Sequence, residues 1–130
     1  MALKVELKPN ERIIIGQVVI RNDAQRTRFF IEGEAPILRE KDILTADTAG
    51  TPAKKIYLAI QLMYLAQDPT HQHDVYFQLV RDFVQAAPSA LPHIHEINNR
   101  ILSSDLYKAL KAAKQLIAYE AELIENATRV

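Results

Sequence analysis

The chain contains no cysteine and only three glycines among its 130 residues. Without cysteine it has no disulfides, no thiolate nucleophile and no thiolate metal ligand. The three glycines are well separated, so the chain has no glycine-rich loop of the kind that cradles a phosphate group. These absences exclude enzymes that depend on a cysteine or on a glycine-rich phosphate loop.

The chain also lacks an excess of charge of either sign. Sixteen basic and sixteen acidic residues give a formal net charge of zero, so no global basic field attracts nucleic acid. Any RNA site must therefore be local. Hydrophobic residues make up 48% of the sequence, which is normal for a folded globular protein.

Long apolar runs are missing as well. No run approaches the roughly 20 residues that a helix needs to cross a bilayer. Residues 1–8 alternate apolar and charged side chains and lack the apolar core of a signal peptide. We therefore expect a soluble, cytoplasmic protein with no membrane partner.

The first third of the chain has the pattern of short antiparallel strands. Leu3, Val5 and Leu7 alternate with charged residues, which predicts a half-buried strand. Asn10 is suited to the left-handed turn that follows. The expected strands cover residues 3–8, residues 13–20 with a bulge or bend at Gly16, and residues 26–32, 37–39 and 43–44.

After residue 50 the pattern becomes helical. Thr51 can cap a helix that has Pro52 in its first turn, and Asp68-Pro69 is expected to end that helix. Three further helices are expected to be capped by Thr70, Ser89 and Ser104. The apolar stripe of the second helix consists of Val75, Phe77, Leu79, Val80, Phe83 and Val84. Short breaks between amphipathic helices favour antiparallel packing.

We therefore predict an α+β fold with two domains. Residues 1–50 form a small antiparallel β-module, and residues 51–130 form a bundle of about four helices. A β-module of about forty residues is too small to bury a stable core by itself, and its open edges must be paired or covered. Either the helices cover the sheet, or two chains share strands in a homodimer.

The β-module resembles the CsrA family of translational regulators. Glu11–Gly16 matches the family's apolar strand that ends in glycine, while Ala35-Pro36, Arg39-Glu40 and Ile43 match its later strand and the charged segment after it. The resemblance implies an interwoven β-dimer that binds mRNA leaders. It also implies that Arg39 is the arginine that contacts RNA.

A longer resemblance covers almost the whole chain. The segments MALKVELKPNERIIIG, RTRFFIEGEAPILREKDILT, TPAKKIYLAIQLMYL and AAPSALPHI, followed by DLYKALKAAKQLIAYE, resemble the FlbT family of flagellum-biosynthesis regulators. This resemblance implies association with the 5′ untranslated region of flagellin mRNA, which lowers translation and lifetime of the message. The partner that this resemblance implies is the flagellin mRNA leader, whereas a second copy of the chain is implied by the resemblance to CsrA.

Five basic side chains form the candidate RNA site: Arg39, Arg26, Arg28, Lys4 and Lys8. An arginine can grip a phosphate or the edge of a guanine through two hydrogen bonds. Arg26 and Arg28 flank Thr27, so on a strand both point to the same face. The alternatives are a surface Arg39 that pairs with Glu40 or Asp42, and a solvated strand face for the other four. Phe29 and Phe30 could stack on bases, but adjacent strand residues face opposite sides, so one belongs to the core.

The histidines do not have the spacing of a metal site. His71 and His73, like His93 and His95, have one residue between them, which separates them by about 200° on a helix. Zinc sites on helices use the i, i+4 spacing instead. We expect no metal, no cofactor, no catalytic residue and no enzyme activity.

An alternative function belongs to the helical half. There the bundle would grip flagellin or another flagellar regulator, and any effect on the mRNA would be indirect. Zero net charge and a helical half without a basic face favour this hypothesis. A groove for a partner helix is then expected around Tyr57, Tyr64 or Tyr107.

Overall fold

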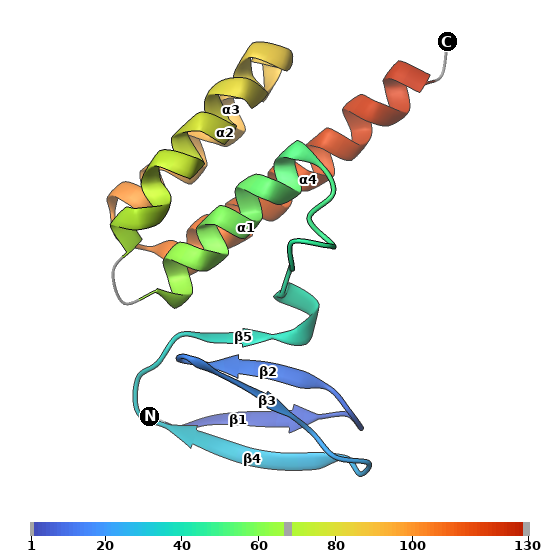
Figure 1. The fold of residues 1–130 in the computed structure, drawn as a ribbon, viewed down its shortest axis with the longest axis vertical. Coiled ribbons are helices and arrows are strands. Elements are labelled where there is room, and N and C mark those ends of the chain that lie inside the picture. Colours follow the sequence, from blue (N-terminus) through green and yellow to red (C-terminus); the bar gives the residue numbers. More distant parts are fainter. Residues whose placement is uncertain (1, 67–68, 129–130) are drawn as a thin grey trace. The chain divides into compact units, whose positions relative to one another are not determined.

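The computed structural model describes residues 2–66 and 69–128, and the chain divides into two compact units (Figure 1). The first unit is Met1–Ile43 and contains the strands, and the second is Leu44–Val130 and contains the α-helices. An antiparallel β-region followed by four helices confirms the predicted α+β class. The division falls after residue 43, whereas the sequence analysis placed the domain boundary after residue 50.

The described residues of the first unit form two small sheets. Their strands are β1 (Ala2–Leu7), β2 (Arg12–Ile15), β3 (Val18–Arg21), β4 (Thr27–Glu32) and β5 (Ile37–Arg39), followed by the 3₁₀ turn η1 (Glu40–Asp42). β1 pairs with β4, and the second sheet has the order β3-β2-β5, with every pair antiparallel. The strands expected near residues 3–8, 26–32 and 37–39 are confirmed.

The core of the first unit follows from the period-2 pattern of its strands. The buried cluster consists of Val5, Leu7 and Ile13, with Ile15, Phe29, Ile31 and Ile37 packed against it. Phe30 faces the opposite side from Phe29 and is 64% exposed. The prediction that one of these two phenylalanines belongs to the core is confirmed.

The strand expected over residues 13–20 is wrong, because two strands occupy this segment. Gly16 has a φ of +61°, the left-handed value that a type II′ turn requires at its first central position. β2 and β3 are therefore the arms of a hairpin, with Ile15 opposite Val18. The left-handed conformation expected at Asn10 is confirmed by its φ of +64°.

The short strand expected at residues 43–44 is also wrong. The backbone of Leu44 bonds to the side chain of Gln61 in place of a neighbouring strand. Its N–H donates to Gln61 Oε1, and Gln61 Nε2 donates to its carbonyl, both at 2.9 Å. One buried amide thus satisfies the two backbone groups that a strand partner would satisfy.

In the second unit a loop over residues 44–51 is followed by helices. Its elements are α1 (Pro52–Leu65), η2 (Pro69–Gln72), α2 (His73–Ala86), η3 (Pro88–Ala90), α3 (Leu91–Leu102) and α4 (Leu106–Thr128). α1 packs against α2 and α4, and α4 also packs against α3. Ile56 and Ile60 of α1 and Leu116 of α4 are fully buried in this core. No helix in the described residues is long and apolar enough to cross a membrane.

The predicted start of α1 is confirmed. The Thr51 side chain accepts a hydrogen bond from the N–H of Lys54 at 3.3 Å, and Pro52 occupies the first turn. The helix ends at Leu65. The stop signal expected at Asp68 lies outside the described residues.

The predicted capping residues of the other three helices are wrong. Thr70 and Ser89 lie in the 3₁₀ turns η2 and η3 that precede α2 and α3, and no side chain caps either helix. Ser104 has a φ of +59°. Asp105 caps α4 in its place, because its Oδ1 accepts a hydrogen bond from the N–H of Lys108 at 3.3 Å.

The buried face of α2 also differs from the expected stripe. Val75 and Phe77 are each 53% exposed, whereas Tyr76 is 1% and Phe83 is 6% exposed. The Tyr76 hydroxyl donates to Asn98 Oδ1 of α3 at 2.6 Å, so this tyrosine enters the core with its polar end satisfied. The apolar pattern of the sequence alone does not identify Tyr76 as a core residue.

Candidate nucleic-acid interface

A pocket of about 380 Å³ in the first unit brings together basic side chains from distant parts of the sequence. It is lined by Glu6, Leu7, Lys8, Glu11, Arg26, Arg39 and Lys41. We call it the basic pocket. Four basic and two acidic side chains give it a local excess of two positive charges, on a chain whose net charge is zero.

Strand pairing explains why these residues meet. β1 and β4 are antiparallel with Leu7 opposite Thr27, so Lys8 and Arg26, the next residues outward, lie at the same end of this sheet. β5 pairs with β2 and places Arg39 opposite Ile13. Three of the five predicted RNA-binding residues, Lys8, Arg26 and Arg39, therefore line one pocket.

The backbone around the basic pocket is held by Asn22, which is 9% exposed. Its Nδ2 donates to the carbonyls of Leu7, Lys8 and Gln25 at 3.1, 2.8 and 2.8 Å. Its Oδ1 accepts from the N–H of Asp23 and the hydroxyl of Thr27, both at 2.9 Å. One side chain thus fixes the end of β1 against the start of β4, where Lys8 and Arg26 emerge.

The cations of the basic pocket are free to meet an anion. Within the described residues, none of Lys8, Arg26, Arg39 and Lys41 forms an ion pair. Glu40, one of the two expected partners of Arg39, pairs instead with Arg12 at 3.3 Å. Of the two pocket carboxylates, Glu11 accepts a hydrogen bond from the backbone N–H of Lys8 at 2.8 Å. A phosphate in the pocket would therefore replace water, not an existing salt bridge.

The remaining predicted residues, Lys4 and Arg28, do not line the basic pocket. In the register of β1 and β4, Lys4 is opposite Phe30 and Arg28 is opposite Glu6. Arg28 and Phe30 are two residues apart on β4 and share its outer face. We call Lys4, Arg28 and Phe30 the outer strand face.

Sequence analysis missed three charged members of the basic pocket: Lys41, Glu6 and Glu11. Lys41 is in η1, directly after β5. Its place beside Arg39 could have been inferred from the charged run that ends this strand. The two glutamates could not, because their part in the pocket depends on how β1 ends against the loop that follows it.

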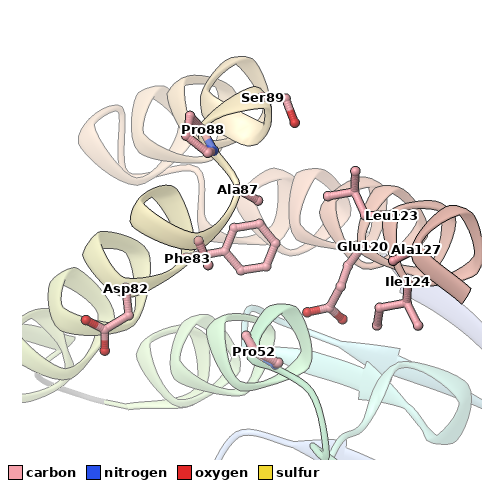
Figure 2. A pocket seen from close by; sticks show the side chains of 11 residues that line it. Pro52, Asp82, Phe83, Ala87, Pro88, Ser89, Glu120, Leu123, Ile124 and Ala127 are labelled. Carbon is pink, nitrogen blue, oxygen red and sulfur yellow. The ribbon is translucent and has the colours of Figure 1, made fainter.

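A second pocket, of about 590 Å³, lies in the helical unit (Figure 2). It is lined by Pro52, Asp82, Phe83, Ala86, Ala87, Pro88, Ser89, Glu120, Leu123, Ile124 and Ala127. Figure 2 shows the Phe83 ring in the space between α2 and α4, with Glu120 reaching in from α4. Glu120 is 6% exposed, and its carboxylate accepts a hydrogen bond at 2.8 Å from the N–H of Ala53 in the first turn of α1.

A groove was expected around Tyr57, Tyr64 or Tyr107, and the burial of Tyr57 excludes only the first of these residues. A groove around Tyr64 or Tyr107 stays a prediction. Tyr57 is only 2% exposed and belongs to the core. Tyr64 packs its ring against Tyr107 at a centroid distance of 6.0 Å. The observed pocket forms around Phe83 because small residues at the end of α2 leave room there that no periodicity reveals.

The fold and the two pockets define a small α+β protein with a basic pocket in its strand unit and an apolar pocket in its helical unit. Residues 3–124 match the family described as flagellar protein FlbT. The chain belongs to this family. The comparison with solved structures found no match.

Named relatives agree with this assignment. The chain is 64% identical over 124 residues to a probable flagellum biosynthesis repressor protein FlbT 1 of Bradyrhizobium diazoefficiens, covering 95% of this chain and 85% of the relative. It is 53% identical over 126 residues to a probable flagellum biosynthesis repressor protein FlbT of Rhodopseudomonas palustris, covering 97% and 100%. The flagellum biosynthesis repressor protein FlbT of Caulobacter vibrioides is 31% identical over 125 residues, covering 94% and 89%.

Proposed function

We propose that this protein is a post-transcriptional regulator of flagellum biogenesis that binds the 5′ untranslated region of flagellin mRNA. Binding represses translation of the message or promotes its degradation. The names of the relatives support the repressor part of this proposal. The protein acts by binding, without catalysis. The resemblance of its strand unit to CsrA stays a prediction.

The observation that carries the RNA proposal is the basic pocket, because its four cations are unpaired within the described residues. Hydrogen bonds from arginine to phosphate or guanine are charge-assisted, and an arginine can form two of them in parallel. Arg39 lies at the end of β5, a strand held on one side by β2. Lys8, Arg26 and Lys41 surround it and supply further phosphate contacts.

The outer strand face adds a contact for an unpaired base. Proteins recognise single-stranded RNA by stacking bases on aromatic side chains beside basic residues. Phe30 is 64% exposed, and Lys4 and Arg28 are its neighbours on the same face. Lys4 and Arg28 thus remain in the proposed RNA-binding set, with Phe30 as the stacking surface between them.

The test is the affinity of the purified full chain for its own flagellin leader RNA. We expect Arg39→Ala to raise the Kd by about tenfold, because one good arginine contact is worth roughly 1–3 kcal/mol. The matched control is Arg100→Ala, which removes an arginine of α3 that pairs with Glu96 at 2.9 Å. This control is expected to leave the Kd unchanged. Equal affinities of wild type and Arg39→Ala would refute the basic pocket as the RNA site.

The apolar pocket favours a second candidate function, which is binding of flagellin or another flagellar regulator by the helical unit. Its two charged lining residues, Asp82 and Glu120, are both acidic. An acidic, apolar pocket repels RNA and suits an apolar protein segment. If the purified wild-type chain fails to bind the leader, the effect on the mRNA is indirect and this second function replaces the first.

A further inference from the structure

β3 is an edge strand with apolar side chains exposed on both of its faces. It pairs with β2 alone, at one end of the sheet β3-β2-β5. Val18, Val19 and Ile20 are 56, 62 and 40% exposed. Edge strands of soluble proteins usually carry charges, prolines or bulges that prevent pairing with another chain. Only the last residue of β3, Arg21, is charged, so this edge lacks such protection over most of its length.

The direction of the backbone groups on β3 follows from one hydrogen bond. The N–H of Asn22 donates to the carbonyl of Glu11 in the segment leading into β2, at 2.8 Å. Backbone groups alternate in direction along an antiparallel strand. The groups of Ile20 and Val18 therefore point to β2, and those of Val19 and Arg21 point to the open edge.

We propose that β3 pairs antiparallel with β3 of a second copy of this chain, with a two-fold axis at Val19. In this register the N–H of Val19 donates to the carbonyl of the partner's Val19, and the reverse bond is equivalent. The pairing joins two three-stranded sheets into one sheet of six strands, in the order β5-β2-β3-β3-β2-β5. Whole strands meet at their edges and none is exchanged.

The register makes β3 complementary to itself. Val18 lies opposite the partner's Ile20 on one face, and Val19 lies opposite its own copy on the other. A slip of one residue would place Val19, whose N–H and C=O point to the open edge, opposite a residue whose N–H and C=O point to β2, so the two strands could not form their hydrogen bonds. In the proposed register Arg21 lies opposite the partner's Gln17, so the two arginines are kept apart. A slip of two residues, centred on Ile20, would bring them to diagonal neighbours and is disfavoured.

A second copy of this chain is a suitable partner for the open edge of β3. The chain has no net charge, so two copies approach without long-range repulsion. Each β3 has one open edge, so the contact closes at two copies, as expected for a two-fold interface. The inference uses only β3 and does not depend on RNA binding.

The absence of cysteine from the chain allows a direct test of the register. In a hydrogen-bonded antiparallel pair the Cα atoms are about 5.5 Å apart, which is within the range of a disulfide. We expect Val19→Cys to form a covalent dimer under mild oxidation, seen on a non-reducing gel. The matched control is Phe30→Cys, because Phe30 is as exposed as Val19 and lies on β4. It is expected to stay monomeric on the gel.

A charge at the same position tests whether the association needs this edge. Val19→Lys places two ammonium groups opposite each other, and we expect the dimer dissociation constant to rise at least about tenfold in sedimentation equilibrium. Phe30→Lys is expected to leave it unchanged, and thermal melting checks that both variants fold. A monomeric wild type, or equal cross-linking of Val19→Cys and Phe30→Cys, overturns the proposal.

Discussion

At the scale of single residues, the side chain of Asn22 holds the backbone that carries Lys8 and Arg26 of the basic pocket. It lies just after β3, and both ends of its side-chain amide are used. The two N–H groups of Nδ2 serve three backbone carbonyls, so the position requires a donor. None of the four cations of the pocket has a comparable structural role, because all four are exposed.

We predict that Asn22→Asp lowers the free energy of unfolding by about 2–4 kcal/mol at pH 7, because a buried carboxylate would face three carbonyls without a proton to donate. Burial raises the pKa of the introduced carboxyl in the folded state. The lost stability should therefore return in part below about pH 4, where the group is protonated in both states. Urea denaturation at pH 7 and pH 4 measures the change.

The matched control for this substitution is the exposed Asn99→Asp, which is expected to change stability by less than about 0.5 kcal/mol. Asn22→Asp should also weaken leader binding, since Lys8 and Arg26 flank the carbonyls that the amide holds. A variant as stable as wild type at pH 7 would show that the amide is not needed.

The basic pocket was only partly predictable at this scale. Arg39 follows from the resemblance to CsrA, and Lys8 and Arg26 follow from their positions at the ends of expected strands. The role of Asn22 was not predicted, because nothing local indicates that its side chain bonds to residues 14 and 15 positions earlier. Long-range hydrogen bonds of this kind depend on strand register, which a single sequence does not determine.

At the scale of elements, α2 and α3 are joined by the hydrogen bond from Tyr76 to Asn98. Burial raises the pKa of the Tyr76 hydroxyl well above its ordinary value, because the tyrosinate cannot be solvated there. The folded state therefore requires the neutral hydroxyl. The contribution of the neutral Tyr76 hydroxyl to the free energy of unfolding is fully present below the ordinary tyrosine pKa, near pH 10. This contribution is lost as the pH rises above that value.

We predict that Tyr76→Phe costs about 1 kcal/mol of stability at pH 7, the net value of one hydrogen bond. Above about pH 10 the wild type should lose stability faster than the variant, since only the wild type must keep this hydroxyl protonated. Chemical denaturation at pH 7, 9 and 10.5 measures both effects. The control is Tyr107→Phe, because Tyr107 is 46% exposed. Parallel pH profiles for wild type and Tyr76→Phe would contradict the assignment.

Some helices and strands could be predicted from the sequence and others could not. Strands with alternating residues and the helix that starts at Thr51 were predicted, because the signal lies within a few residues. The hairpin at Gly16 was taken for a bend, since apolar residues on both sides of the glycine read as one continuous run. The segment at Leu44 looked like a strand, but its backbone bonds to a side chain 17 residues later, which local pattern cannot indicate.

At the scale of the whole molecule, charge is balanced overall but concentrated locally. The sequence excluded a global basic field, and the described part of the chain has a pocket with four basic and two acidic lining residues. The order of a β-region and a helical unit was predictable because the change in periodicity is abrupt. The set of residues that lines the basic pocket was not predictable, because it depends on which strand ends lie close together.

The charge balance leads to a prediction for the salt dependence of RNA binding. Each phosphate contact on a single strand contributes about −0.7 to the slope of log K against log salt. Because the basic pocket has four cations, we expect a slope no steeper than about −3 for wild type, and about 0.7 shallower for Arg39→Ala. The slope can be measured by filter binding to the flagellin leader between about 50 and 300 mM salt, the range over which release of counterions changes the affinity. Arg100→Ala should keep the wild-type slope. A wild-type slope much steeper than −3 would mean that cations outside the basic pocket, such as Lys4 and Arg28 on the outer strand face, carry most of the phosphate contacts.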